Sequence, residues 1–358
     1  MLWLTVLVFI GLLLVLVLAH EWGHFIVARG AGCGVEEFAF GFPPRLFSFV
    51  RRGTRYSFNL LPIGGYVKIE GEDMDDPYPG PTNFASKTPL KRLLVLAAGV
   101  LMNAVLAAVL LSIQAGIGIP TLVTEENVDR VHDIKTFIVD VAANSPAEQA
   151  GIKTLDRVVS IDAVTNPTAK QIQSLVTENL GQPMVIEVER QGVHKIVTAI
   201  PRTEWPPEEG AWGVVLQETG LERVVWWQAP LVGGERTGQM LVSIGGQFWL
   251  LLQRLVTEGT MGEVITGPVG IAIYTNEVTN LGVSYILEFA ALISLNLALI
   301  NILPFPALDG GRILFVGLEI LFRRRLPARW EQATHMTGFA LLILLMIFIT
   351  FKDITRFF

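Results

Sequence analysis

Four long apolar runs dominate the pattern of hydrophobic and polar positions along the chain. They cover residues 1–28, 93–119, 285–303 and 336–351, and the last is marginal in length. A helix needs about 20 apolar residues to cross a bilayer. The pattern therefore predicts an α-helical polytopic membrane protein with about four transmembrane helices. No Lys or Arg precedes the first run, which favours a retained helix over a cleaved signal peptide.

The segment between the first two runs is too apolar for a plain loop. Its stretch RYSFNLLPIGGYVKIEG, residues 55–71, reads as two short extended runs bent at residues 62–65. This pattern predicts a membrane-associated β-hairpin. The hairpin is either a simple surface feature or an edge strand that awaits a partner.

Residues 125–203 predict an inserted α/β domain outside the membrane. The stretch NSPAEQAG, residues 144–151, carries the signals of a short capped helix. Strand-like runs surround it, and a second helix is expected near 168–179. The pattern resembles a PDZ domain of the bacterial type, a module that binds peptides by adding a strand to its sheet.

The next segment is rich in tryptophan. Residues 224–256 contain VVWWQAP and MLVSIGGQFWLLLQRLV, which suit interfacial amphipathic helices. A spanning helix is the alternative, against which Gly245, Gly246 and Arg254 argue.

The predicted domains are 1–124 with the first two transmembrane helices and the β-loop, 125–203 PDZ-like, 204–284 linker and interfacial helices, and 285–358 with the last two transmembrane helices.

Charge gives the expected orientation and excludes one class of partner. The chain of 358 residues is 51% hydrophobic and 17% charged, with net charge -6, so we expect no nucleic acid as a partner. Lys and Arg gather between the first two spans and between the last two, which places those loops inside. The termini and the PDZ-like domain are then outside. The expected location is the cell inner (cytoplasmic) membrane, with several passes.

Ionisable residues interrupt the first apolar run at membrane depth. His20, Glu21 and His24 form a His-Glu-x-x-His pattern. On a helix, its two imidazoles share one face and can bind one Zn²⁺, while the glutamate can act on water. The alternative is a pair of interfacial histidines beside a glutamate that reaches toward the headgroups. Helix geometry places the histidines about 7–13 Å inside the membrane boundary. Unpaired polar groups at that depth carry a free-energy cost, which a bound metal ion would offset.

A third ligand is expected at the end of the third run. There the stretch NILPFPALDGG has prolines that break the helix, and Asp309 follows them. The first and third spans run in the same direction, so Asp309 arrives at the same side as His20 and His24. Irregular backbone at this depth must be surrounded by protein or by a water-filled cavity. The alternative is an aspartate that only caps the next helix.

These motifs together resemble the site-2 protease family, the M50-type intramembrane zinc metalloproteases, in its bacterial RseP/RasP-like branch. The resemblance covers nearly the whole chain. It implies that His20, His24 and Asp309 bind zinc, that Glu21 is the general base and that Asn301 holds the substrate. It also implies that Gly65, Tyr66, Val67 and Lys68 present the substrate as a strand. GVLMN, residues 99–103, resembles a second-span motif whose usual proline is replaced here by Val100, which leaves the role of Asn103 open.

The resemblance further implies a function. The chain would be a zinc metalloendopeptidase that cuts membrane-spanning segments in regulated intramembrane proteolysis, with anti-sigma factors or signal-peptide remnants as substrates. The substrates would be single-span proteins in the lipid bilayer, already cut once on the outer side. Two other classes are weaker: a zinc-binding membrane scaffold would fill four protein ligand positions, and a metal transporter would carry ionisable residues in more spans.

Overall fold

The computed structural model describes residues 2–72, 80–190, 192–206, 209–259, 267–324 and 327–357. The described chain separates into two compact units. Unit 1 contains residues 1–112, 230–279 and 286–358, and unit 2 contains residues 113–229 and 280–285. Each unit is described below by itself.

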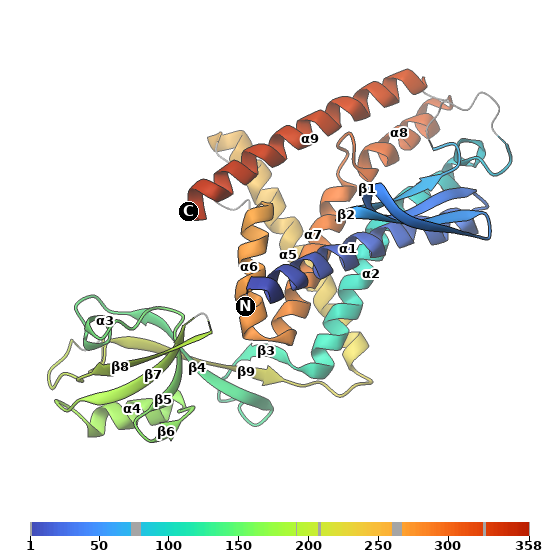
Figure 1. Ribbon diagram of the computed structural model, residues 1–358. Coiled ribbons are helices and arrows are strands. Elements are labelled where there is room, and N and C mark those ends of the chain that lie inside the picture. Colours follow the sequence, from blue (N-terminus) through green and yellow to red (C-terminus); the bar gives the residue numbers. More distant parts are fainter. Residues whose placement is uncertain are drawn as a thin grey trace. The chain divides into compact units, whose positions relative to one another are not determined.

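Long helices form most of unit 1 (Figure 1). Among the residues that the structure describes, five helices are long and apolar enough to cross a membrane, one more than the sequence predicts. The long helices are α1 Leu2–Gly30, α2 Pro89–Ile117, α5 Ala229–Glu258, α7 Val283–Ile302 and α9 Ala328–Phe357. The shorter helices are α6 Pro268–Leu281, α8 Asp309–Phe322 and the 3₁₀ turn η1 Phe84–Ser86. The chain is thus a polytopic membrane protein, but the count of four spans is not confirmed.

The additional candidate span is α5, which the sequence analysis places at the membrane interface. It is one continuous helix of 30 residues that runs through Gly245 and Gly246. A Cβ atom at either glycine would meet no atom within 4 Å, so no described residue packs closely against these two positions of the helix.

Both the start of α5 and the start of α7 lie beside the C-terminal end of α2. At the start of α5, a Cβ on Gly233 would lie 2.6 Å from the backbone nitrogen of Ser112. At the start of α7, the Gln114 side chain donates a 3.0 Å hydrogen bond to the carbonyl of Ser284. The α7 helix therefore starts at the C-terminal end of α2, whether or not α5 spans the membrane.

The α1 and α7 helices both run antiparallel to α2. In α1, Leu12 packs near Leu106, while Gly23 lies against Ala98. In α7, the Ser294 hydroxyl donates a 2.8 Å hydrogen bond to the carbonyl of Asn103, closer to the start of α2. The first and third predicted spans thus run in the same direction, and both end on the side where α2 begins.

The predicted hairpin is present, but its turn is elsewhere. The strands are β1 Val35–Arg51 and β2 Thr54–Ile69, joined at Arg52 and Gly53, which both have positive φ. Two such residues form the tight turn that matches strand twist. The bend predicted at residues 62–65 lies inside β2. It folds β2 back, so that Phe38 of β1 pairs with both Tyr56 and Val67.

Unit 2 is an antiparallel sheet with two short helices. The strand order is β3-β9-β4-β5-β7-β8, and β6 pairs with β5. The strands are β3 Ile119–Leu122, β4 Val131–Val141, β5 Arg157–Ile161, β6 Val164–Thr165, β7 Met184–Arg190, β8 Val193–Ala199 and β9 Val214–Glu222, and the helices are α3 Pro146–Gln149 and α4 Ala169–Glu178. Ser145 caps α3, as the signals in residues 144–151 predict, and Thr168 caps α4. Ile138, Ile186 and Trp212 lie in its core.

Candidate metal centre

Three side chains from two distant parts of unit 1 meet at one point. His20 and His24 project from α1, and Asp309 is the first residue of α8. The Asp309 Oδ2 atom lies 3.2 Å from His20 Nε2 and 3.3 Å from His24 Nε2. The two Nε2 atoms are 3.3 Å apart. Within the described residues, this is the only cluster of three or more such ligands close enough for one metal ion.

The triangle has the dimensions of three corners of a tetrahedral zinc site. Zinc bonds to nitrogen and oxygen are about 2.0–2.2 Å long, which sets neighbouring ligand atoms roughly 3.3–3.6 Å apart. Asp309 Oδ2 is buried and makes no hydrogen bond to any described residue, despite the two nearby imidazoles. A buried carboxylate oxygen without a partner is unusual, and a metal ion would satisfy it. These residues could therefore hold a zinc ion.

Asp309 does not act as a helix cap. The N-cap of α8 is Leu308, and this end of the helix has no side-chain capping hydrogen bond. The Asp309 carboxylate instead points to the two histidines on α1. The alternative in which Asp309 only caps the helix is therefore not what the structure shows.

The α2 helix orients both imidazole rings. His24 Nδ1 lies 2.8 Å from the carbonyl oxygen of Val95, which can only accept a hydrogen bond. The proton of a neutral His24 is therefore on Nδ1, and Nε2 keeps its lone pair for a metal. The carboxamide nitrogen Nδ2 of the fully buried Asn103 lies 3.3 Å from His20 Nδ1. Asn103, which the sequence left open, thus has the position of an orienting partner for His20.

Gly99 permits the close approach of α2 to the two histidines. A Cβ atom at this position would lie 2.6 Å from His20 Cε1 and would overlap His24 Nε2. Even the smallest side chain would therefore displace both rings. Gly99 belongs to the GVLMN stretch that resembles a second-span motif, but a glycine in an apolar helix does not by itself reveal a contact with an imidazole.

We expect Gly99→Ala to weaken zinc binding strongly, because the added methyl group would push the imidazoles out of the triangle. Displacing the rings should reduce zinc affinity by at least the roughly 10–100-fold seen when outer-shell partners are lost. Competition with a zinc chelator would measure it. Gly116→Ala in the same helix is the matched control, because a Cβ there meets no atom within 4 Å. Equal zinc affinity in the two variants would contradict this account of Gly99.

Glu21 lies between the histidines and the β-hairpin. A Cβ atom on Gly65 of β2 would be 3.6 Å from Glu21 Cγ and 3.5 Å from Val17 Cγ1, so this part of β2 lies against α1. Residues 65–68 pair with β1 along one edge. The expected strand segment and the expected base are thus neighbours.

Two other predicted residues are not joined to the triangle. Asn301 is partly buried in the last turn of α7, and its side chain makes no hydrogen bond within the described part of the chain. Lys68 reaches across the hairpin to Glu36, with 2.7 Å between Nζ and Oε2. The structure therefore assigns neither side chain a direct contact with the candidate ligands.

Comparison with known proteins identifies relatives over the whole chain. The model of peptidase family M50 matches residues 8–345. A Clostridium perfringens protein that is named as a zinc metalloprotease is 34% identical over 340 residues, which cover 95% of each chain. The zinc metalloprotease RasP of Oceanobacillus iheyensis is 31% identical over 438 aligned positions and 99% of each chain. RasP of Geobacillus kaustophilus is 29% identical, with 96% of each chain covered.

Proposed function

Because this chain belongs to peptidase family M50 and is a zinc metalloprotease, we propose that it cuts peptide bonds inside the membrane-spanning segments of other proteins. The observation that carries the proposal is the triangle of His20, His24 and Asp309, whose two histidines lie on α1, a helix apolar enough to span a bilayer. Ionisable side chains inside a bilayer carry a free-energy cost, so their presence there indicates a function.

The three side chains of the triangle would hold the zinc ion, and a fourth position would remain open. When bound, zinc supplies Lewis-acid chemistry, polarising a carbonyl group and making water more acidic. A site with three protein ligands is typical of catalytic zinc, whereas structural zinc sites have four. Val95 and Asn103 would keep the rings in place. The Asn103 Nδ2 atom is directed at His20 Nδ1. A neutral His20 that offers Nε2 would need this carboxamide turned over, with its oxygen accepting the proton on Nδ1.

Glu21 would move the proton. Its carboxylate would take a proton from the attacking water and return it to the leaving amine. Its position on α1, one residue after His20 and next to β2, supports this role. A general base must lie within hydrogen-bond reach of the water that it activates. Among the acidic residues, Glu21 is the one that follows His20 directly in the chain.

The substrate would lie extended beside the hairpin. A helical substrate hides its carbonyl groups in hydrogen bonds, so it must unwind locally before it can be cut. Residues Gly65, Tyr66, Val67 and Lys68 would hold it as an added strand, and Asn301 would bind it near the scissile bond. The double pairing of Phe38 leaves the segment 65–69 at one edge of the folded hairpin, which supports this role.

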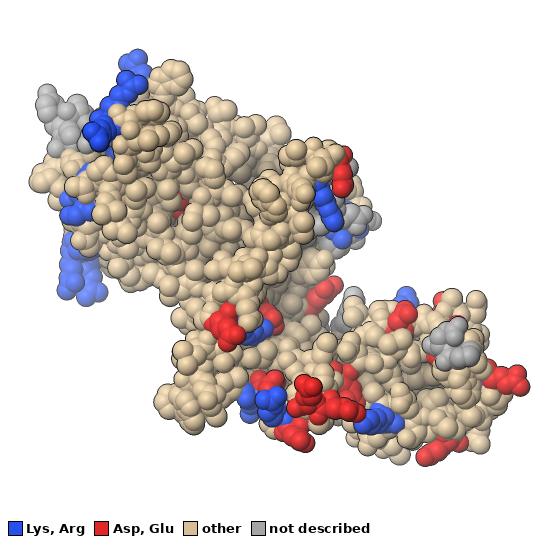
Figure 2. Space-filling view, turned by 180° about the vertical axis from the view of Figure 1, so that it is seen from behind, with Lys and Arg blue, Asp and Glu red and all other residues tan. Residues whose placement is uncertain are grey.

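The protein would lie in the cytoplasmic membrane, with unit 2 outside and the zinc site toward the cytoplasmic side. Lys and Arg of unit 1 gather near the hairpin and the α8–α9 connection (Figure 2). Exposed members of this group include Arg51, Arg52, Arg323 and Arg324. Positive loops favour the inside. The return of the chain to the end of α2 after α6 keeps the direction of α7 compatible with this orientation.

Unit 2 would be a PDZ-like domain that acts at the entrance. Its sheet and two capped helices support this assignment. An external domain of this kind would exclude substrates that still carry a bulky outer part. The enzyme would then act after a first external cut, as in the removal of anti-sigma factors or of signal-peptide remnants. The competing role is capture of the new C-terminus that the first cut creates.

A single experiment tests the substrate class and the role of unit 2. Purified protein in lipid vesicles would receive one single-span substrate in untrimmed and externally trimmed forms, and mass spectrometry would locate the cut. We expect a cut within the apolar span of the trimmed form. A cut outside the span would contradict intramembrane proteolysis.

The second arm removes residues 124–213 and joins the ends by a short Gly-Ser linker. This deletion keeps β3 and β9, whose pairing includes Ile119 with Glu222. If unit 2 is a filter, the variant should cut the untrimmed substrate and keep its rate on the trimmed one. If unit 2 captures the new C-terminus, the variant should cleave the trimmed substrate more slowly than the full-length protein does, and it should still not cleave the untrimmed substrate.

A further inference from the structure

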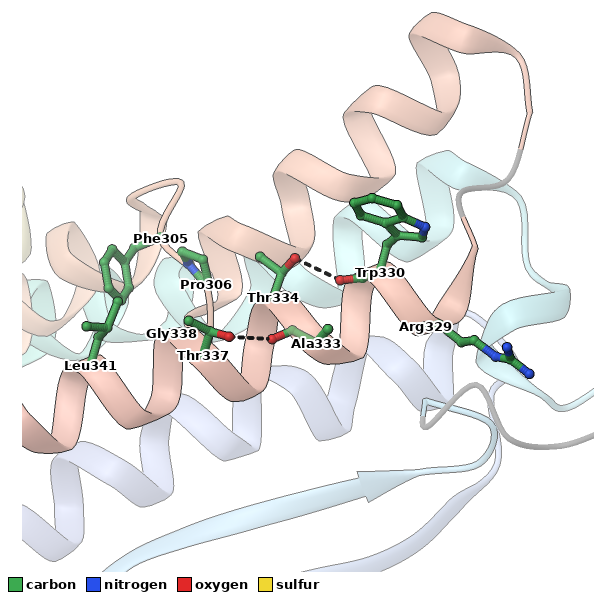
Figure 3. Close-up of a pocket in the computed structure, with 9 residues that line it drawn as sticks. All are labelled: Phe305, Pro306, Arg329, Trp330, Ala333, Thr334, Thr337, Gly338 and Leu341. Carbon is green, nitrogen blue, oxygen red and sulfur yellow. Dashed lines mark hydrogen bonds between the residues drawn. The ribbon is translucent and has the colours of Figure 1, made fainter.

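The turn between α7 and α8 is held from the side by α9. This turn, residues 303–308, is called the proline turn here. Pro306 lies against Gly338 of α9 in Figure 3, and a Cβ on Gly338 would be 2.6 Å from the Pro306 carbonyl oxygen. About one turn earlier on α9, His335 also contacts the proline turn, because its Nδ1 accepts a 2.9 Å hydrogen bond from the Ala307 N–H.

The contact falls on the most constrained residue of the proline turn. Ala307 has φ of 75°, in the left-handed region that residues with a side chain rarely adopt. Its N–H is directed at His335. A strained conformation of this kind persists only where its surroundings hold it. The hydrogen bond to His335 is therefore a direct restraint on this conformation.

The position of Asp309 depends on this turn. Ala307 is two residues before Asp309, and Leu308 provides no side-chain cap that could fix the start of α8 independently. The backbone behind Asp309 is also tightly packed, because a Cβ on Gly311 would overlap the carbonyl oxygen of Phe305. A change at Ala307 would thus be passed on to the carboxylate that faces the two histidines of α1.

The surroundings of His335 fix its ring in the accepting form. The Phe315 ring of α8 packs against it, with 5.7 Å between the centroids. Because Nδ1 accepts from Ala307, the proton of a neutral ring is on Nε2. Nε2 is buried and has no partner among the described residues, so the Ala307 contact is the hydrogen bond that defines its role.

We propose that His335 is a positioning residue of the zinc site: by holding the N–H of Ala307, it stabilises the turn that presents Asp309 to His20 and His24. This inference rests on the proposed function of the three ligands. It assigns His335 no contact with zinc or substrate.

The test compares zinc affinity in full-length variants by competition with a chelator. His335→Leu removes the acceptor at similar volume and should weaken zinc binding about 10–100-fold, as expected for an outer-shell partner. His335→Asn offers a side-chain oxygen near the position of Nδ1 and should stay within about threefold of the wild type. Thr337→Val is the matched control on the same helix, because its hydroxyl donates a hydrogen bond within α9, to the carbonyl of Ala333 (Figure 3).

A suppressor separates positioning from simple packing. Glycine adopts positive φ without strain, so Ala307→Gly should restore much of the zinc affinity that His335→Leu loses. The absorption bands of the cobalt-substituted protein should weaken in His335→Leu and recover in the double variant. For cleavage, His335→Leu should lower kcat and leave KM nearly unchanged, because the substrate strand is untouched.

Two results would overturn the proposal. One is wild-type zinc affinity in His335→Leu, and the other is equal loss in His335→Leu and His335→Asn with no recovery from Ala307→Gly. His20→Ala serves as the reference for the proposed function. If His20→Ala also binds zinc normally, the proposed site itself fails, whereas normal binding only in His335→Leu refutes the positioning role alone.

Discussion

Replacing Glu21 by Gln should leave zinc bound and nearly abolish cleavage. The amide is close in size to the carboxylate and leaves His20, His24 and Asp309 unchanged, but it cannot take a proton from water. General bases contribute about 10²–10⁴-fold to rate, and the loss should fall in this range or beyond it. Elemental analysis would give the zinc content, and single-turnover cleavage of a trimmed substrate would give the rate.

Glu288→Gln is the matched control for the Glu21 variant. Glu288 lies on α7 and pairs with Arg236, with 2.9 Å between Oε1 and the guanidinium nitrogen. Both side chains are partly buried and neither residue is a proposed ligand or base, so the loss of this ion pair should leave both zinc and cleavage intact. Cleavage by zinc-loaded Glu21→Gln at the rate of this control would remove Glu21 from the mechanism.

Replacing Asp309 by Ala should remove zinc as well as activity. Two imidazoles would remain, and the loss of affinity should exceed the roughly 10–100-fold that an outer-shell partner costs. The effect on folding should be small by comparison, because a carboxylate at a helix N-terminus contributes about 0.3–1 kcal/mol. Chelator competition and thermal unfolding of the zinc-free protein would measure the two effects separately.

Asp353→Ala is the control for Asp309→Ala. Asp353 is also a buried aspartate, and its Oδ2 accepts a 2.8 Å hydrogen bond from the Gly270 N–H near the start of α6. Its replacement should reduce stability and leave the zinc stoichiometry at the wild-type value. A full complement of zinc with unchanged affinity in Asp309→Ala would show that this aspartate is not a ligand.

The meeting of the three candidate ligands could be predicted because it follows from direction along the chain. His20 and His24 share a helix face through their spacing, and Asp309 follows the end of a span that runs the same way. The structure brings these side chains within 3.3 Å of one another. Hydropathy indicated where each of these spans ends. The direction of α7 agrees with the prediction because the chain returns to the end of α2 after α6, although the predicted count of four spans omitted α5.

Hydropathy was a weaker guide to α5. Its most apolar window has mean hydropathy 1.2, against 1.9–2.6 for the other four candidate spans. Its glycine pair and Arg254 pointed to the interface. Glycine is, however, more frequent in membrane helices than in soluble ones, and whether such a pair interrupts a helix depends on its surroundings. A sequence window alone does not contain that information.

The hairpin turn and the supports of the site depend on tertiary contacts. Pro62 and Gly64 give a strong local signal for a turn, whereas Arg52 adopts a positive φ that is uncommon for its residue type. The contacts of Gly99 with the histidines and of His335 with the proline turn join residues far apart in the chain. The hydrogen bond between His335 and the Ala307 N–H could therefore not be predicted from the sequence.

X-ray absorption at the zinc edge of the purified full-length protein tests the central claim most directly. The account predicts one zinc per chain with a shell of nitrogen and oxygen at about 2.0–2.2 Å, including the outer scattering of two imidazoles. The imidazole scattering should fall in His20→Ala and in His24→Ala. A zinc shell without imidazole scattering, or one that is unchanged in both variants, would contradict the assignment of the site.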